Sequence, residues 1–95
     1  MKAFISQPMR GKTDDEIKAE RENMISVLKT RCGDDVEVLD SFFEDFNGNG
    51  LAFLAKSIEV LSKADVAIFA AGWEGARGCR IEHECAVQYG VKVLE

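Results

Sequence analysis

The fold is decided by residues 65–86, which read DVAIFAAGWEGARGCRIEHECA. The unbroken apolar run at 66–71 is typical of a strand that is buried on both of its faces. Glycines follow at positions 72, 75 and 78, and they mark a turn. Beyond them, the apolar side chains recur at helical spacing as far as Gly90. We therefore predict a strand over 65–71 and a helix over 77–90.

The rest of the chain repeats this alternation of strand and helix. Strands are predicted over 2–6, 36–40 and 91–94, and helices over 14–32 and 51–63. Thr13 and Glu16 form a capping box before the first helix, and Gly33 ends it. Strict alternation predicts one α/β domain over residues 1–95. We expect a three-layer, flavodoxin-like or Rossmann-like fold whose parallel sheet has four strands in the order 2-1-3-4, with helices on both faces.

Composition narrows the range of partners. The hydrophobic share of 46% argues against a disordered chain. The formal charge is −5 and no basic cluster is present, which disfavours binding to a nucleic acid polymer. No apolar run is long enough to span a membrane, and no signal peptide is predicted. Three cysteines without paired spacing fit a reducing compartment. We therefore expect a cytoplasmic protein with no membrane partner.

The carboxyl ends of parallel strands are the usual place for a ligand, and three segments meet there: residues 6–12, 40–50 and 71–78. Glycine turns before helices bind phosphate through backbone N–H groups, and Arg10 adds a charged fork. The phenylalanines of the second segment either pack beneath it or line an apolar slot. The candidate ligand contacts from the second and third segments are Asp40, Phe42, Phe43, Gly72, Trp73, Glu74 and Gly78.

Glu82 is the residue of the third helix that most needs an explanation. On a helical wheel, Ile81, Cys85, Ala86 and Tyr89 share one face, and Glu82 lies in the middle of it. A carboxylate that faces inward is costly unless it is paired or functional. One interpretation pairs it with Arg77, Arg80 or a backbone donor, and the other makes it part of the site.

The other chemically active side chains of this helix have simpler interpretations. His83 falls on the polar face without a partner cluster, so we interpret it as a surface residue and predict no metal site. Cys79 and Cys85 are interpreted as core residues.

Three stretches carry a family resemblance: FISQPMRG at 4–11, DSFF at 40–43 and GCRIEHECA at 78–86. Together they resemble the nucleoside 2-deoxyribosyltransferase-like superfamily, and most closely its short bacterial and phage-type members. The resemblance implies that Glu82 is the nucleophile that attacks the anomeric carbon of a deoxynucleoside. Met9, Arg10 and Gly11 are similar to the phosphate-binding loop of the deoxynucleoside 5′-monophosphate N-hydrolases, and Ser6 and Gln7 would complete the sugar–phosphate cradle.

Two functions follow as hypotheses. The first is an enzyme without a cofactor that cleaves the N-glycosidic bond of a 2′-deoxynucleoside or its 5′-monophosphate, or transfers the deoxyribosyl group. The second is a non-catalytic module that binds or senses a nucleotide in the same crevice. Phe4 and Glu84 favour the second, because active relatives usually carry a tyrosine and a glycine at these positions.

We also expect a homodimer or a higher homo-oligomer. The predicted third and fourth strands are apolar on both sides, yet no helix follows the fourth strand to cover the face that bears the first helix. Apolar patches of that size are rarely left open to water. Arg21 lies within the apolar stripe of the first helix, where it either extends its head to solvent or joins an ion pair across an interface.

Overall fold

The computed structural model describes residues 1–39 and 50–94. In chain order, the elements are β1 (Lys2–Ser6), α1 (Asp14–Cys32), β2 (Glu37–Val38), α2 (Gly50–Leu61), β3 (Val66–Phe69), the 3₁₀ turn η1 (Trp73–Gly75), α3 (Arg77–Gln88) and β4 (Lys92–Leu94). All strand pairs are parallel, and the order in the sheet is β2-β1-β3-β4. The predicted α/β architecture and strand order are therefore confirmed.

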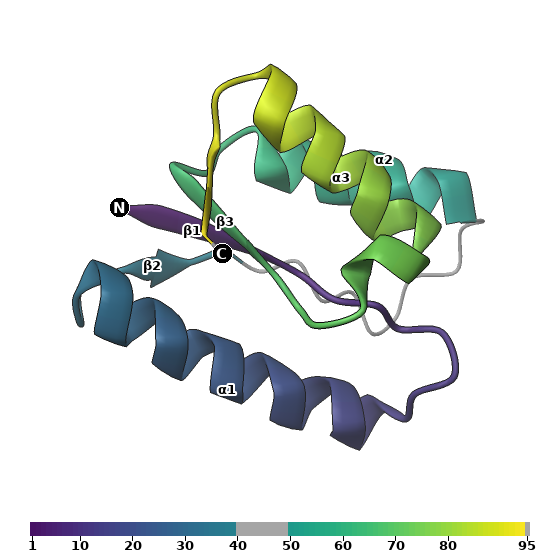
Figure 1. The fold of residues 1–95 in the computed structure, drawn as a ribbon, viewed down its shortest axis with the longest axis horizontal. Coiled ribbons are helices and arrows are strands. Elements are labelled where there is room, and N and C mark those ends of the chain that lie inside the picture. Colours follow the sequence, from purple (N-terminus) through teal and green to yellow (C-terminus); the bar gives the residue numbers. More distant parts are fainter. Residues whose placement is uncertain (40–49, 95) are drawn as a thin grey trace.

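The sheet is the middle of three layers. Helix α1 lies on one face, while α2 and α3 lie together on the other (Figure 1). Successive residues of β1 and β3 point to opposite faces. Ala3, Ile5, Val66 and Ile68 accordingly join the core beneath α1, and Phe4 and Ala67 join the core beneath α2 and α3. Strands β1 and β3, at the centre of the sheet, therefore contribute side chains to both cores.

Helix α1 begins and ends where local sequence signals predict. The Thr13 hydroxyl accepts a hydrogen bond from the backbone N–H of Glu16 at 3.2 Å, and the Glu16 carboxylate accepts one from the N–H of Thr13 at 3.4 Å. Gly33 follows the last turn with φ of 101°, a backbone conformation that favours glycine. The capping box and the glycine stop are both confirmed.

Several boundaries differ from the predictions. The N–H of Val36 bonds to the Gly33 carbonyl at 3.2 Å, so this residue belongs to a turn and β2 is shorter than expected. Leu51 is exposed because it lies in the first turn of α2. In α3, Tyr89 is exposed because the helix ends before it, and Ile81 is 38% exposed. Asp40, Phe42 and Phe43 lie outside the described residues.

The expectation of an uncovered sheet face is wrong for the described part of the chain. The side chains of β3 and β4 that face α1 are at most 9% exposed, and they pack into the core beneath that helix. Met24 and Leu28 of α1 belong to the same buried cluster as Val66, Ile68 and Leu94. Within residues 1–39 and 50–94, no helix has the length and apolar character that a membrane crossing requires.

Candidate functional site

A cleft of about 970 Å³ opens at the edge of the sheet where the strands have their carboxyl ends. Within the described residues, three segments line it: the loop after β1, the first turns of α2, and the stretch from the end of β3 into α3. Its lining residues are Gln7, Pro8, Met9, Arg10, Gly50, Leu51, Phe53, Leu54, Gly72, Gly75, Ala76, Arg77, Gly78, Cys79, Arg80, Ile81 and Glu82. The cleft thus lies where open parallel sheets bind ligands.

Glu82 is the single acidic side chain among the described residues that line this cleft. It projects from α3 toward the sheet and is only 7% exposed. The hydroxyl of Ser6, the last residue of β1, donates a hydrogen bond to Glu82 Oε1 at 2.5 Å. The side chain predicted to face inward is therefore buried, and it is joined to the central strand.

Burial raises the pKa of the Glu82 carboxyl above its ordinary value, because removal from water disfavours the charged form. Hydrogen bonds from Ser6 and Ser57 act in the opposite direction and lower it. Ser57 lies on the buried face of α2, so hydroxyls from a strand, β1, and from a second helix, α2, hold the carboxylate.

The predicted pairing of Glu82 with an arginine is wrong for the described residues. The guanidinium of Arg80 donates from Nη1 to the backbone carbonyl of Glu74 at 2.9 Å instead. Arg77 and Arg80 both line the cleft, and neither contributes to the pKa shift of Glu82. Among the residues that the structure describes, the donors to this carboxylate are the neutral hydroxyls of Ser6 and Ser57.

Cys79 lies one turn before Glu82 and is buried at the wall of the cleft. Desolvation raises the pKa of its thiol, and a hydrogen bond with Ser6 lowers it. Its burial agrees with the prediction of a core residue, but the sequence did not indicate that it also borders the cleft. Ser6 therefore contacts two chemically active side chains of α3.

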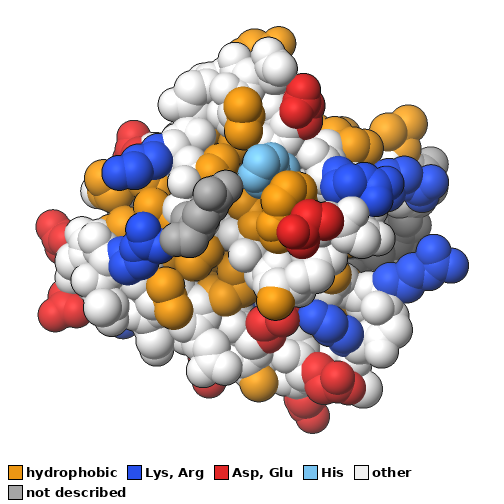
Figure 2. All heavy atoms as spheres, in the orientation of Figure 1, with side chains coloured by type: hydrophobic (Ala, Val, Ile, Leu, Met, Phe, Trp, Pro, Cys, Tyr) orange, Lys and Arg blue, Asp and Glu red, His pale blue; other side chains and the backbone are white. Residues whose placement is uncertain are grey.

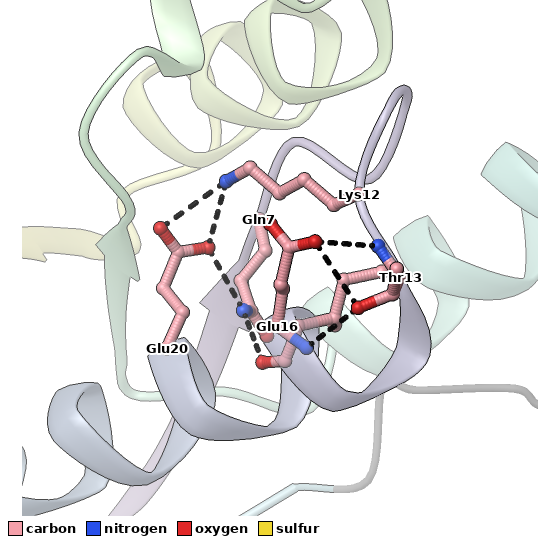
Figure 3. A network of polar contacts seen from close by, with 6 residues as sticks. Gln7, Lys12, Thr13, Glu16 and Glu20 are labelled. Carbon is pink, nitrogen blue, oxygen red and sulfur yellow. Dashed lines mark hydrogen bonds and ion pairs between the residues drawn. The ribbon is translucent and has the colours of Figure 1, made fainter.

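The loop after β1 is fastened to α1 by a polar network (Figure 3). Gln7 Nε2 donates to the carbonyl of Ile17 at 3.0 Å and to Glu20 Oε1 at 3.1 Å. Lys12 Nζ pairs with the same carboxylate oxygen at 3.2 Å. Gln7 thus borders the cleft, but its amide nitrogen is directed toward α1. These contacts fix the base of the loop that carries Met9 and Arg10.

At the tip of this loop, Gly11 has φ of 81°, and the N–H of Lys12 donates to the carbonyl of Met9 at 3.2 Å. Gly11 therefore permits the turn but does not line the cleft. Arg10 is exposed at the rim. Across from it, α3 starts after Ala76, which provides no side-chain cap. The first N–H groups of that helix favour an anion.

Trp73 and Glu74 line a second, smaller hollow of about 260 Å³, together with Phe69, His83, Val93 and Leu94. The rings of Trp73 and His83 stack with centroids 4.0 Å apart and an interplanar angle of 11°. Phe69 meets His83 edge-on at 4.9 Å. His83 is half-buried in this cluster, so its interpretation as an unpartnered surface residue is wrong. The stack joins Trp73 of the 3₁₀ turn to His83 of α3. Helical periodicity does not reveal a contact between two separate elements.

The sequence interpretation missed four residues that line the cleft, Phe53, Leu54, Arg77 and Arg80, and it missed Ser57, which forms a hydrogen bond with Glu82. One signal was present, because Ser57 lies on the same face of its helix as Leu54 and Leu61. A polar residue in an apolar stripe is the same signal that identified Glu82. Within residues 1–39 and 50–94, no group of three His, Cys, Asp or Glu side chains is placed to hold a metal ion.

Comparisons with known proteins add no identification. The chain matches neither a protein-family model nor a curated protein sequence.

Proposed function

We propose that this protein cleaves the N-glycosidic bond of a 2′-deoxynucleoside or its 5′-monophosphate, or transfers the deoxyribosyl group, with Glu82 as the nucleophile. The observation that carries the proposal is the buried Glu82 carboxylate at the cleft, which Ser6 holds at 2.5 Å. The resemblance of residues 78–86 to the nucleoside 2-deoxyribosyltransferase-like superfamily supports the same role.

In the first step, a Glu82 oxygen attacks the anomeric carbon while the bond from that carbon to the base nitrogen breaks. The base leaves with the bonding electrons and takes a proton from water, and a glutamyl–deoxyribose ester remains. Water, or the nitrogen of a second base, then attacks the same carbon, the bond to the Glu82 oxygen breaks to release the carboxylate, and the proton of the attacking group goes to the hydroxide left by the first step. A poorly solvated carboxylate suits this role, because little water has to be displaced from it before the attack.

The walls of the cleft match the other parts of such a substrate. Leu51, Phe53, Leu54 and Ile81 provide apolar surface for a base, and Arg10 at the rim provides a charge-assisted donor for a 5′-phosphate. The hydroxyl of Ser6, at the end of β1, holds the Glu82 carboxylate in place. The volume of about 970 Å³ is at the upper end of the range for small-molecule sites.

A second candidate is a nucleotide-binding module without turnover. The observation that favours it is the raised pKa of Glu82. A higher pKa increases the protonated fraction of the carboxyl at any given pH, and the protonated form is a poor nucleophile that can donate a hydrogen bond to a ligand. Phe4 also favours a module without turnover, since it is packed in the core beneath α2 and α3 and brings no hydroxyl to the carboxylate.

Base release from a panel of deoxynucleosides and their monophosphates, followed by chromatography across a range of pH, tests the proposal. A nucleophilic Glu82 requires release to increase as the pH rises through its pKa, and Glu82→Gln should abolish release. Binding that stabilises the protein to heat without release of base would support the second candidate. Equal release by wild type and Glu82→Gln would refute the role of Glu82.

A further inference from the structure

Three arginines line the cleft, although the chain as a whole carries a formal charge of −5. Arg10 comes from the loop after β1, and Arg77 and Arg80 come from the first turns of α3. Figure 2 shows Lys and Arg side chains gathered at the edge of the molecule where this loop and the start of α3 lie in Figure 1. Three of the 12 Lys and Arg side chains of an acidic protein therefore border one cleft.

The charge of these arginines is not neutralised by the described residues. The guanidinium of Arg80 donates to the backbone carbonyl of Glu74, which fixes its position but leaves its charge intact. Within residues 1–39 and 50–94, neither Arg10 nor Arg77 pairs with a carboxylate, and Glu82 is held by serine hydroxyls. Unpaired guanidinium groups that converge on one cleft favour an anion with several charges.

A single phosphate does not account for this arrangement. One guanidinium fork satisfies two oxygens of a phosphate, and Arg10 alone provides that fork on its side of the cleft. Arg77 and Arg80 stand on a different element, and the cleft of about 970 Å³ has room for a ligand longer than a nucleoside monophosphate.

We propose that the cleft binds a nucleotide with two or three linked phosphate groups, with Arg10 on one side of the phosphate chain and Arg77 and Arg80 on the other. This inference rests on the proposed function for the position of the sugar and base. It goes further in naming the ligand class as nucleoside di- and triphosphates. The base faces the apolar wall at the start of α2, and the phosphate chain runs along the basic rim.

Isothermal titration calorimetry with 2′-deoxynucleoside mono-, di- and triphosphates of the same base tests the inference. Glu82→Gln serves beside the wild type as a form that cannot turn the ligand over. We expect the triphosphate to bind about tenfold or more tightly than the monophosphate, because charge-assisted hydrogen bonds are added. The double variant Arg77→Ala/Arg80→Ala should lose this gain while its monophosphate affinity stays within about twofold.

Arg31→Ala, an exposed arginine in the last turn of α1, is the matched control and should keep the gain. Arg77→Lys/Arg80→Lys guards against a loss of folding, because it keeps the charge and should keep most of the gain. Inorganic tripolyphosphate is a separate probe: binding as tight as that of the triphosphate would show that the site recognises the phosphate chain alone, which contradicts a nucleotide ligand.

Equal affinity for mono- and triphosphates, or no binding of any nucleotide, would overturn the inference. Tight binding of the triphosphate without release of base would uphold it while refuting catalysis. Release of base from the monophosphate, with no increase in affinity from further phosphates, would overturn the inference while supporting catalysis.

Discussion

Ser6 and Glu82 are 76 positions apart in the chain, yet the hydroxyl of the first donates to the carboxylate of the second at 2.5 Å. Ser6 is the last residue of β1 and pairs with Phe69 in β3, so its position is fixed by the centre of the sheet. Glu82 is fixed by the packing of α3 against β3 and β4 of the same sheet. The geometry of the candidate site therefore depends on the core of the fold and not on a surface loop.

Ser6→Ala should destabilise the protein, because it leaves a buried carboxylate oxygen without its donor. The expected loss in free energy of unfolding is about 1–3 kcal/mol, measured by urea denaturation. The pKa of Glu82 should also rise further, since the Ser6 bond lowers it, and ¹³C NMR of the carboxyl carbon follows this directly. Ser26→Ala on the exposed side of α1 is the control. If neither the free energy of unfolding nor the pKa of Glu82 changed, the contact would not stabilise the carboxylate.

The stability of the protein should depend on the protonation of Glu82 in an unusual direction. Its pKa is raised in the folded state above the unfolded value of about 4.5, so the folded state binds the proton more tightly than the unfolded chain does. This contribution to stability is complete below the unfolded pKa and is lost as the pH rises through the folded pKa.

Glu82→Gln removes that dependence. The difference in free energy of unfolding, wild type minus variant, should therefore decrease as the pH rises from 4 to 8, measured by urea denaturation at each pH. Glu84→Gln, at an exposed position of the same helix, should give a difference with little dependence on pH. A wild-type advantage that grows with pH would contradict the raised pKa.

His83→Ala should destabilise the protein despite the polar face on which the residue lies. The stack with Trp73 and the edge contact with Phe69 are worth about 0.5–1.5 kcal/mol each beyond area burial. The fluorescence of Trp73, the single tryptophan of the chain, should change in the folded variant. Glu84→Ala, one position along, should change neither stability nor fluorescence appreciably. An unchanged emission spectrum in His83→Ala would contradict the stacked geometry.

Whether the sequence predicts a contact depends on how far apart the two residues lie along the chain. The capping box of Thr13 and Glu16 and the stop at Gly33 are local, and both are found where predicted. The inward position of Glu82 follows from helical periodicity alone. The strand order 2-1-3-4 is also confirmed, because parallel strands with right-handed crossovers allow few arrangements.

Contacts between separate elements could not be predicted in the same way. The stack of Trp73 on His83 joins a 3₁₀ turn to a helix, and no periodicity links the two residues. Ser57 approaches Glu82 from another helix, which depends on how α2 and α3 pack. Leu51 fits the apolar stripe of its helix but is exposed, because the first turn of α2 lies at the cleft and not over the sheet.

The homodimer stays an untested prediction. The sheet face that motivated it is buried within one chain, so its interface has to be tested at apolar side chains that remain exposed. Ile25 and Val93 pack against the two cores of one chain, so an aspartate at either position would damage the fold itself. Arg21 donates from Nη2 to the carbonyl of Leu39 at 3.0 Å, a contact within one chain. Val27 is a better probe because it is exposed on α1.

Light scattering after size exclusion should give about twice the chain mass of 10.5 kDa. Val27→Asp should convert the dimer to a monomer with unchanged circular dichroism, because a buried charge opposes association through this face. Lys29→Asp, at an exposed position in the last turn of α1, controls for a general effect of charge on this helix. A monomer at tens of micromolar would reject the prediction.

Arg10 provides the sharpest separation between a nucleotide site and a nucleoside site. It lies at the rim of the cleft, on a loop whose base is fastened to α1 through Gln7 and Lys12. If its guanidinium holds the 5′-phosphate, Arg10→Ala should weaken binding of a deoxynucleoside monophosphate far more than binding of the nucleoside. A hydrogen bond to a charged group is worth about 1.5–3 kcal/mol, which corresponds to roughly a ten- to hundredfold loss of affinity. Calorimetric titration of both ligands measures the two losses on the same protein, and Arg31→Ala should affect neither. Equal losses for the two ligands would assign Arg10 to the shape of the loop or to long-range attraction, and not to a phosphate.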